Sequence, residues 1–320
     1  EPEAHLHPQL TVLLADYLAN NTPGARTPQT IVSTHSPVLA AKIPPSRIHV
    51  LFTEHQSHQP RCNSLTSVGF SEKEECELSR MMDITRAILY FAKGIILVEG
   101  ITEALLLPIL AKRLGYDLAK LHISVIPICG VSFGTFQKLL GPLALGVPVS
   151  IVTDGDPPVV RGQNWEGDVP ARDNGSFAVS DRTAVVLKGF ADVVTVKVYH
   201  SKVTLEYDLA EAGAGNAELM AEVWESCFVG KPSTFNQQRV TEAGDTLEAK
   251  ALAAWRGICR ADHTGSKAQF AHQLASRLDG TDGKKYCPLT FHVPQYIQDA
   301  IRHVVSQSSI AEVSEKPSNI

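Results

Sequence analysis

The sequence lacks cysteine pairs, long apolar runs and an excess of positive charge. Its six cysteines are scattered with no C-x-x-C pair, so neither a zinc ribbon nor a disulfide framework is expected, and a reducing cytosol suits the chain best. It has no run of about 18 apolar residues and no signal peptide at its amino end, so no membrane partner is expected. The net charge of −5 argues against a binder held to nucleic acid by bulk charge, although a local basic groove is compatible with it.

The remaining composition is that of an ordinary globular protein. Of 320 residues, 44% are apolar and 20% are charged, and this length predicts about two domains. We see no internal repeat. The chain begins Glu1-Pro2 without a methionine, so we expect it to be a part of a longer protein.

The apolar pattern predicts an α/β protein with a parallel sheet covered by helices on both faces. In the first part we expect a helix at 6–19, strands at 30–34 and 47–52, a polar loop or hairpin at 53–75, and a helix at 71–92. The central part alternates strands at 95–98, 124–128, 149–153 and 193–198 with helices at 102–114 and 133–140. A surface insertion is expected at 157–182, a mostly helical region from 207 to about 306, and a frayed tail after it.

Pairs of carboxylates follow two of the predicted strands. Glu99 ends the apolar run 94–98, with Glu103 one helical turn further on, and Asp154 and Asp156 end the run 149–153. The carboxyl ends of parallel strands meet at one edge of a sheet, where ligand sites form. In extended backbone Asp154 and Asp156 would point to one side, with Gly155 allowing close approach of a ligand.

A further acid follows the fourth strand. Glu206 is placed to reach the same edge, and Asp208 is the weaker candidate. A single acid at a strand end is commonly only a solvated charge. A cluster of carboxylates would instead repel and destabilise the fold unless a cation neutralised it. The sequence therefore predicts a divalent-metal site.

Hard cations such as Mg²⁺ or Mn²⁺ take oxygen ligands of this kind and suit phosphoryl transfer. Five acids are more than one Mg²⁺ normally takes, so two ions roughly 4 Å apart are expected. A positive side chain should offset charge in the transition state. Lys267 is the best candidate, although its spacing alone would read as a surface lysine.

The motifs together resemble the OLD (overcoming lysogenization defect) family of nucleases, in which an ABC-type ATPase precedes a Toprim domain. L-V-E-G-I-T-E, V-T-D-G-D and T-L-E-Y-D-L are similar to the family's Toprim motifs. G-S-K-A-Q-F-A and V-P-Q-Y-I fit its carboxyl region. The segment E-P-E-A-H-L-H-P resembles the end of a Walker B motif with the D-loop. The segment I-V-S-T-H-S-P resembles the one that carries the switch histidine.

This resemblance implies an ATPase remnant at 1–92, a Toprim catalytic domain at 93–210 and a helical region at 211–320. It implies two-ion cleavage of DNA with Lys267 assisting, and a possible homodimer formed through the ATPase part of the full-length protein. A role in phage defence rests on the resemblance alone. The metal ligands that it implies are Glu99, Glu103, Asp154, Asp156 and Glu206.

The resemblance gives two residues a role in ATP hydrolysis. Glu1 corresponds to the acid that positions the hydrolytic water, and His35 to the switch histidine. The sequence has no G-x-x-x-x-G-K-[ST] loop to hold the nucleotide phosphates. We therefore expect ATP to be a cofactor of the full-length protein only.

Two other function classes stay open from the sequence. A Toprim topoisomerase needs a tyrosine nucleophile, and the nearest, Tyr207, lies inside the proposed ligand motif. A primase would carry a zinc module that is not seen. A non-catalytic adaptor linked to an ATPase would keep the acids for folding alone.

Overall fold

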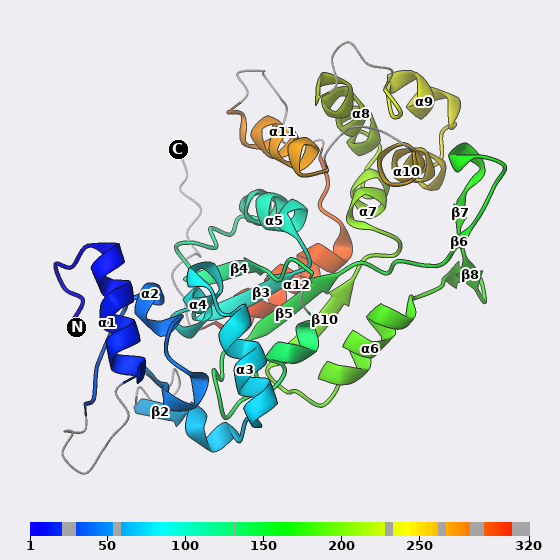
Figure 1. Ribbon diagram of the computed structural model, residues 1–320. Coiled ribbons are helices and arrows are strands. Elements are labelled where there is room, and N and C mark those ends of the chain that lie inside the picture. Colours follow the sequence, from blue (N-terminus) through cyan, green and yellow to red (C-terminus); the bar gives the residue numbers. More distant parts are fainter. Residues whose placement is uncertain are drawn as a thin grey trace.

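The computed structural model describes residues 1–20, 30–53, 59–130, 132–227, 233–261, 267–281 and 291–308. A four-stranded parallel sheet with the order β10-β5-β3-β4 lies at its centre (Figure 1). Its strands are β3 (Gly94–Val98), β4 (Ile123–Pro127), β5 (Val149–Thr153) and β10 (Val196–His200). The predicted α/β class with a parallel sheet is confirmed.

The strands end level with one another. Val98 pairs with both Val152 and Pro127, and His200 pairs with Thr153. Every residue of β3 and β5 is buried, as expected for strands that are covered on both faces. The loops after β3 and β5 therefore leave the sheet at one common edge.

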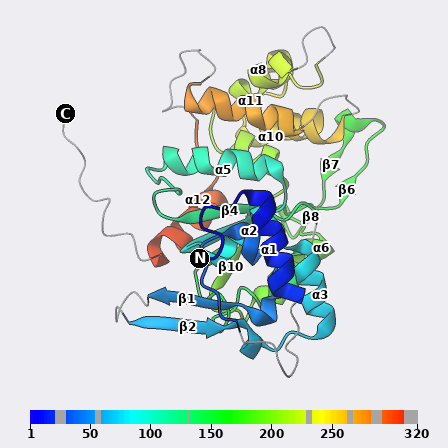
Figure 2. The ribbon, with the colours of Figure 1, turned by 60° about the vertical axis from the view of Figure 1, so that its left-hand side comes forward.

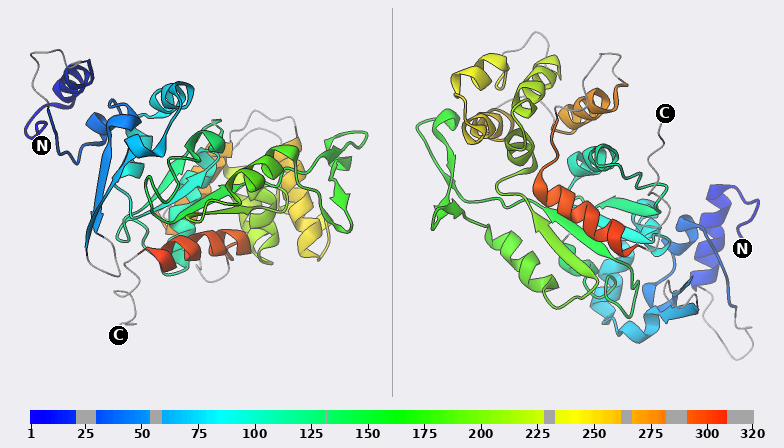
Figure 3. Two further views of the ribbon diagram at one scale, coloured as in Figure 1. Left: turned by 90° about the horizontal axis from the view of Figure 1, so that it is seen from below. Right: turned by 180° about the vertical axis from the view of Figure 1, so that it is seen from behind.

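Helices cover both faces of the sheet. Ile96 and Val98 face one core, shared with α5 (Ile101–Arg113) and α12 (Gln295–Gln307). Ile95 and Leu97 face a second core, to which α3 (Glu72–Met81), α4 (Ile84–Ala87) and the turns after β4 contribute. Figure 3 shows α12, in red, lying along the sheet. The alternation of side chains along a strand sends neighbouring residues into different cores.

The carboxyl-terminal third is helical, as expected, and packs on α5. The first core continues through these helices, and Figure 2 shows α10 and α11 stacked beyond α5. The helices are α7 (Leu205–Glu211), α8 (Asn216–Cys227), α9 (Gln237–Glu242), α10 (Leu247–Trp255), the π turn η6 (Arg256–Arg260) and α11 (Lys267–Asp279).

The first 92 residues differ from expectation in two places. Residues 30–34 form no strand: they pair with no described strand, and Ile31 is 89% exposed. The helix expected at 71–92 is divided at Asp83, whose carboxylate accepts a bond from the Arg86 N–H and begins a new helix. The elements are α1 (Pro8–Asn20), α2 (Pro37–Ala40), η1 (Pro45–Arg47), the hairpin β1 (His49–Thr53) and β2 (Pro60–Ser64), η2 (Leu65–Val68), α3 (Glu72–Met81), α4 (Ile84–Ala87) and η3 (Ile88–Tyr90).

Beside the sheet, the helix after β4 is shorter than expected, and the helix that follows the insertion was not expected. The helix expected at 133–140 is reduced to the short 3-10 turn η4 (Phe133–Phe136), and Gly134 within it disfavours a regular α-helix. The insertion after β5 forms two small hairpins and a short turn and leads into α6 (Asp181–Phe190), which Ser180 caps. These hairpins lie at the opposite end of the molecule from the amino terminus (Figure 1). They are β6 (Val159–Val160) with β7 (Val169–Pro170), the turn η5 (Trp165–Gly167), and β8 (Arg172–Asp173) with β9 (Ser176–Phe177).

Candidate metal centre

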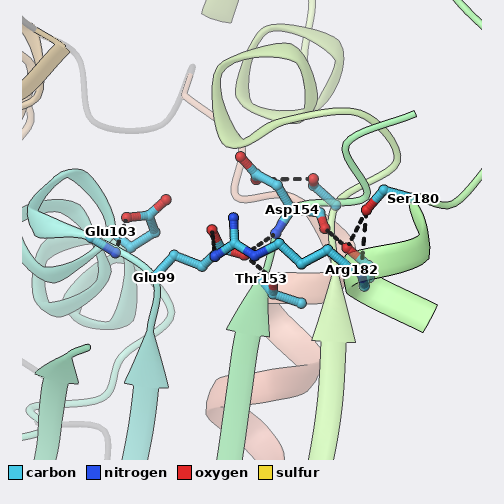
Figure 4. A network of polar contacts seen from close by, with 9 residues as sticks. Glu99, Glu103, Thr153, Asp154, Ser180 and Arg182 are labelled. Carbon is cyan, nitrogen blue, oxygen red and sulfur yellow. Dashed lines mark hydrogen bonds and ion pairs between the residues drawn. The ribbon is translucent and has the colours of Figure 1, made fainter. Parts of the chain in front are cut away.

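Glu99 and Asp154 lie side by side at the carboxyl edge of the sheet. Asp154 directly follows β5, and its backbone N–H lies 3.4 Å from Glu99 Oε1. The Thr153 hydroxyl donates to the same oxygen. Figure 4 shows both acids above the strand ends, with Glu103 beside them. Adjacent strands thus bring together residues that are 55 positions apart.

Glu103 is held at the amino end of α5. Its Oε2 accepts a bond of 3.1 Å from the Gly100 N–H, which belongs to the turn joining β3 to α5. Burial and the nearby charges of Glu206 and Glu99 raise the pKa of the Glu103 carboxyl above its usual value. The short turn therefore places two carboxylates over one crevice.

Hydroxyl groups from the residue after β10 and from α6 hold Asp154 in place. The Ser201 hydroxyl donates to Asp154 Oδ1 at 3.1 Å, and the Thr183 hydroxyl donates to the Asp154 carbonyl at 2.7 Å. Burial and four other acids, with Glu206 the strongest, raise the pKa of Asp154 well above its usual value. A carboxylate with so raised a pKa indicates a site that lacks compensating charge.

The backbone at Asp156 differs from the extended conformation expected. Asp156 is left-handed, with φ of 46°, and its N–H donates to the Val203 carbonyl. Gly155 makes room for the protein itself: a Cβ there would lie 2.6 Å from the Ser201 carbonyl oxygen. A ligand was expected against Gly155, but the loop after β10, at Ser201 and Lys202, occupies the space beside it.

Glu206 lies in the first turn of α7 and is 3% exposed. Lys267 Nζ, from the start of α11, lies 3.1 Å from its Oε1, and the Cys259 thiol donates to its Oε2 at 3.4 Å. Burial alone would raise the pKa of Glu206, but Lys267 and neighbouring donors outweigh it and hold the pKa below its usual value. Lys267 is thus a partner of a buried acid rather than a free surface lysine.

Asp208 has a structural role in the next turn. Its carboxylate accepts bonds from the backbone N–H groups of Lys202, at 2.9 Å, and Val203, at 3.3 Å. Burial raises its pKa to about 6. These bonds close the loop after β10.

Arg182 is a site residue that sequence reasoning missed. Its Nη2 lies 3.1 Å from Glu99 Oε2, and in Figure 4 its side chain reaches across the strand ends from the start of α6. Burial and Glu99 raise the pKa of Asp156, and the charges of Arg182 and Lys267 partly offset this. The sequence feature that could have indicated Arg182 is S-D-R-T, a helix cap followed by charged residues, in the segment after the D-G-D motif.

The five acids fit divalent cations by donor type and place, though not in their present rotamers. Among the described residues, no three His, Cys, Asp or Glu side chains are arranged to hold a metal ion as they stand. Each of four carboxylates instead accepts bonds from the protein: Glu99, Glu103, Asp154 and Glu206. Two cationic side chains face five carboxylates, so negative charge is in excess. Bound divalent cations would neutralise that excess.

The two residues expected at an ATPase site lie together at the amino end. His35 Nε2 is 3.5 Å from Glu1 Oε1, and both side chains are exposed. The neighbouring Thr34 hydroxyl donates to Glu3. The segments 1–8 and 31–37, separated in sequence, are therefore neighbours in the fold. No described helix has the length and apolar character needed to cross a membrane.

A parallel sheet with acids from successive loops at its carboxyl edge is an arrangement of the Toprim class. Residues 90–156 match the family model described as "Overcoming lysogenization defect protein-like, TOPRIM domain". Residues 1–41 match that described as "AAA domain, putative AbiEii toxin, Type IV TA system". The chain thus carries an OLD-like TOPRIM domain, preceded by a segment of an AAA-type ATPase domain, and the resemblance seen in the sequence is confirmed.

Solved structures similar to the chain include carboxyl-terminal regions of OLD proteins. That from Burkholderia pseudomallei is 26% identical, with a TM-score of 0.47, and the match covers 68% of this chain and 98% of that one. One from Xanthomonas campestris pv. campestris is 24% identical, with a TM-score of 0.45, covering 70% and 98%. No curated protein matches the chain.

Proposed function

We propose that the chain is a metal-dependent endonuclease that hydrolyses DNA phosphodiester bonds. The observation that carries this proposal is the gathering of Glu99, Glu103 and Glu206 around the buried Asp154, whose pKa burial and these neighbouring charges raise. Asp156 completes the set from the same loop. Phosphoryl transfer is the chemistry that such a carboxylate site serves when it holds Mg²⁺ or Mn²⁺.

The residues of the chain would divide the work as follows. The five carboxylates would hold the cations, and two bound ions would supply activation of a water and stabilisation of the leaving oxygen. Lys267 carries its charge beside Glu206 and offsets negative charge that develops on the phosphoryl group. Ser201 and Thr183 keep Asp154 oriented through their hydrogen bonds.

The proposed division of the chain follows the same reasoning. Residues 1–92 would be the end of an ATPase domain, 93–210 the Toprim domain, and 211–320 the helical region that supplies Lys267. In the full-length protein the cleavage site would be coupled to ATP hydrolysis, and dimers would form through the ATPase part. A cytoplasmic role in phage defence belongs to this proposal as well.

Supercoiled plasmid tests the proposal. The purified chain is incubated with plasmid and Mg²⁺, Mn²⁺, Ca²⁺ or EDTA, beside Asp154→Ala of confirmed fold. Nicked and linear products that need metal and vanish in Asp154→Ala are expected. A ladder of closed topoisomers would indicate a topoisomerase instead, and no cleavage by any folded sample would favour the adaptor. The burial of Tyr207, 0% exposed, argues against its use as a nucleophile.

A further inference from the structure

A pocket of about 170 Å³ opens next to the acid cluster. Asp156 and Lys267 form the side that it shares with the cluster, and Val159 lines it from the hairpin β6–β7. Trp255, Cys259 and Arg260 line it from the helical region. A ligand in this pocket would touch the proposed catalytic residues at one end and mixed apolar and basic side chains at the other.

The π turn η6 builds the far wall of the pocket. The Ala261 N–H donates to the Arg256 carbonyl, five residues back, which widens the turn that continues α10. The Thr234 hydroxyl donates to the Gly257 carbonyl at 2.7 Å. Single π turns within helices occur frequently at functional sites, because they redirect side chains at a cost in stability. Here Trp255, Cys259 and Arg260 are directed to one pocket.

Arg260, which lines the pocket, belongs to a cluster of arginines around Asp168. Asp168 is 2% exposed and accepts a bond of 3.0 Å from Arg260 Nε, while Arg161 Nη1 lies 3.5 Å away. Arg256 Nε donates to the Asp168 carbonyl at 2.8 Å. Two guanidinium groups thus contact the Asp168 carboxylate and a third contacts its backbone carbonyl, so the arginines outnumber the acid. The Arg161 side chain is 72% exposed beside Asp168, so a strand of nucleic acid can reach it from solvent.

We propose that this pocket binds the nucleotide adjacent to the scissile phosphodiester. Its base would lie against Val159 and the wall of η6, and its phosphate would bind Arg161 and Arg260. The inference rests on the proposed nuclease function. The pocket has the size of one base rather than a base pair, so the base must be unpaired when it enters. The site therefore favours single-stranded or locally opened nucleic acid, as basic grooves beside apolar walls do in strand-binding proteins.

The test measures binding of a fluorescein-labelled single-stranded thymidine oligonucleotide in an Asp154→Ala background, which prevents cleavage. Val159→Trp fills the pocket and is expected to weaken binding by about tenfold, since an accommodated base contributes at least that much. Val160→Trp is the control on the same strand, where the native side chain is 55% exposed, and should stay within about twofold of the background.

Arg161→Ala gives a second readout that does not depend on packing. Loss of one phosphate contact should reduce the salt dependence of binding, lowering the slope of log K against log salt by about 0.7 in magnitude. Arg302→Ala, a partly exposed arginine on α12 outside the pocket, should leave the slope unchanged. If all variants show equal affinity and equal salt slope, while wild-type cleavage depends on Asp154, the proposed nucleotide pocket is wrong and the nuclease proposal stands. A chain that neither binds nor cleaves nucleic acid would overturn the nuclease proposal with it.

Discussion

Arg182 Nη2 lies 3.1 Å from Glu99 Oε2, so a protein cation already stands at the carboxylate that follows β3. The proposed metal ions require the same carboxylate. A divalent cation must therefore compete with Arg182 for Glu99 or share it. The affinity for metal therefore depends on Arg182, at the start of α6, as well as on the carboxylates.

Replacement of this arginine should change metal affinity. Arg182→Ala removes both the competitor at Glu99 and one positive charge near Asp156, so Mn²⁺ should bind severalfold more tightly in a calorimetric titration. Lys188→Ala is the control, because it removes an equal charge from an exposed position on the same helix. Unchanged Mn²⁺ affinity in Arg182→Ala would show that Glu99 is not a ligand.

Metal and pH should act together on stability. The pKa values of Glu103, Asp154 and Asp156 are raised in the folded protein. The folded protein therefore favours the protonated form of these carboxyls. The resulting stabilisation is fully present below the usual carboxyl pKa, near 4, and is lost as pH rises through the raised pKa values. Without metal, the melting temperature should fall as pH rises from about 5 to 8, and Mg²⁺ or Mn²⁺ should restore it most at the higher pH.

The matched variant for this measurement is Asp154→Asn. It removes the most perturbed charge without changing shape, so the metal-free melting temperature at pH 8 should rise by a few degrees, about 2–4 °C per kcal/mol in a domain of ordinary size. The stabilisation by metal should be largely lost. A metal-free stability that is equal in the two proteins across the pH range would contradict the charge crowding described here.

The ion pair of Lys267 and Glu206 should contribute to stability as well as to activity. Lys267→Ala leaves a buried carboxylate unpaired. Its cost should be about 1–3 kcal/mol, below that of a fully buried pair because the lysine side chain is 41% exposed. Glu206→Gln should remove most of the penalty, so a double-mutant cycle in urea should show coupling. Additive effects would mean that the two residues do not interact.

Gly155 should tolerate no side chain. An added Cβ would lie 2.6 and 2.8 Å from the carbonyl oxygens of Ser201 and Lys202, and these are backbone atoms that cannot turn aside. Gly155→Ala should cost about 1–3 kcal/mol of unfolding free energy and weaken metal binding by displacing Asp154 and Asp156. Gly189→Ala, within α6 with open space around it, should instead stabilise slightly. Equal stability of the two variants would refute this packing.

The chain alone should not bind ATP tightly. Glu1 and His35 lie 3.5 Å apart, yet the sequence supplies no phosphate-binding loop beside them. A titration with mant-ATP should show no saturable fluorescence change at micromolar protein. Saturable binding that His35→Ala abolishes would overturn this expectation.

The sequence could predict the sheet and the order of its acids because both follow from local pattern. Buried strands read as continuous apolar runs, and a parallel sheet brings their carboxyl ends to one edge, where Glu99 and Asp154 lie. Residues 30–34 have the β-branched pattern of a strand but pair with no strand among the residues that the structure describes. Pairing depends on the rest of the fold, so composition alone gave the wrong result there.

Contacts between distant elements could not be derived in the same way. Arg182 reaches Glu99 only because α6 starts beside the end of β5, and Lys267 meets Glu206 only because α11 and α7 both pack on α8. No spacing rule relates residues so far apart in sequence. The left-handed turn at Asp156 depends likewise on the loop after β10, against which Gly155 packs.

The central claim is that the strand-end carboxylates hold catalytic divalent cations. The most direct test is diffraction from crystals of the chain soaked in Mn²⁺, with anomalous scattering used to locate the ions. The account predicts manganese bound by Asp154, with Glu99 turned from Arg182 toward the metal and a second ion near Glu206 or Asp156. Anomalous maps without manganese at the carboxyl edge of the sheet, from crystals saturated with Mn²⁺, would contradict it.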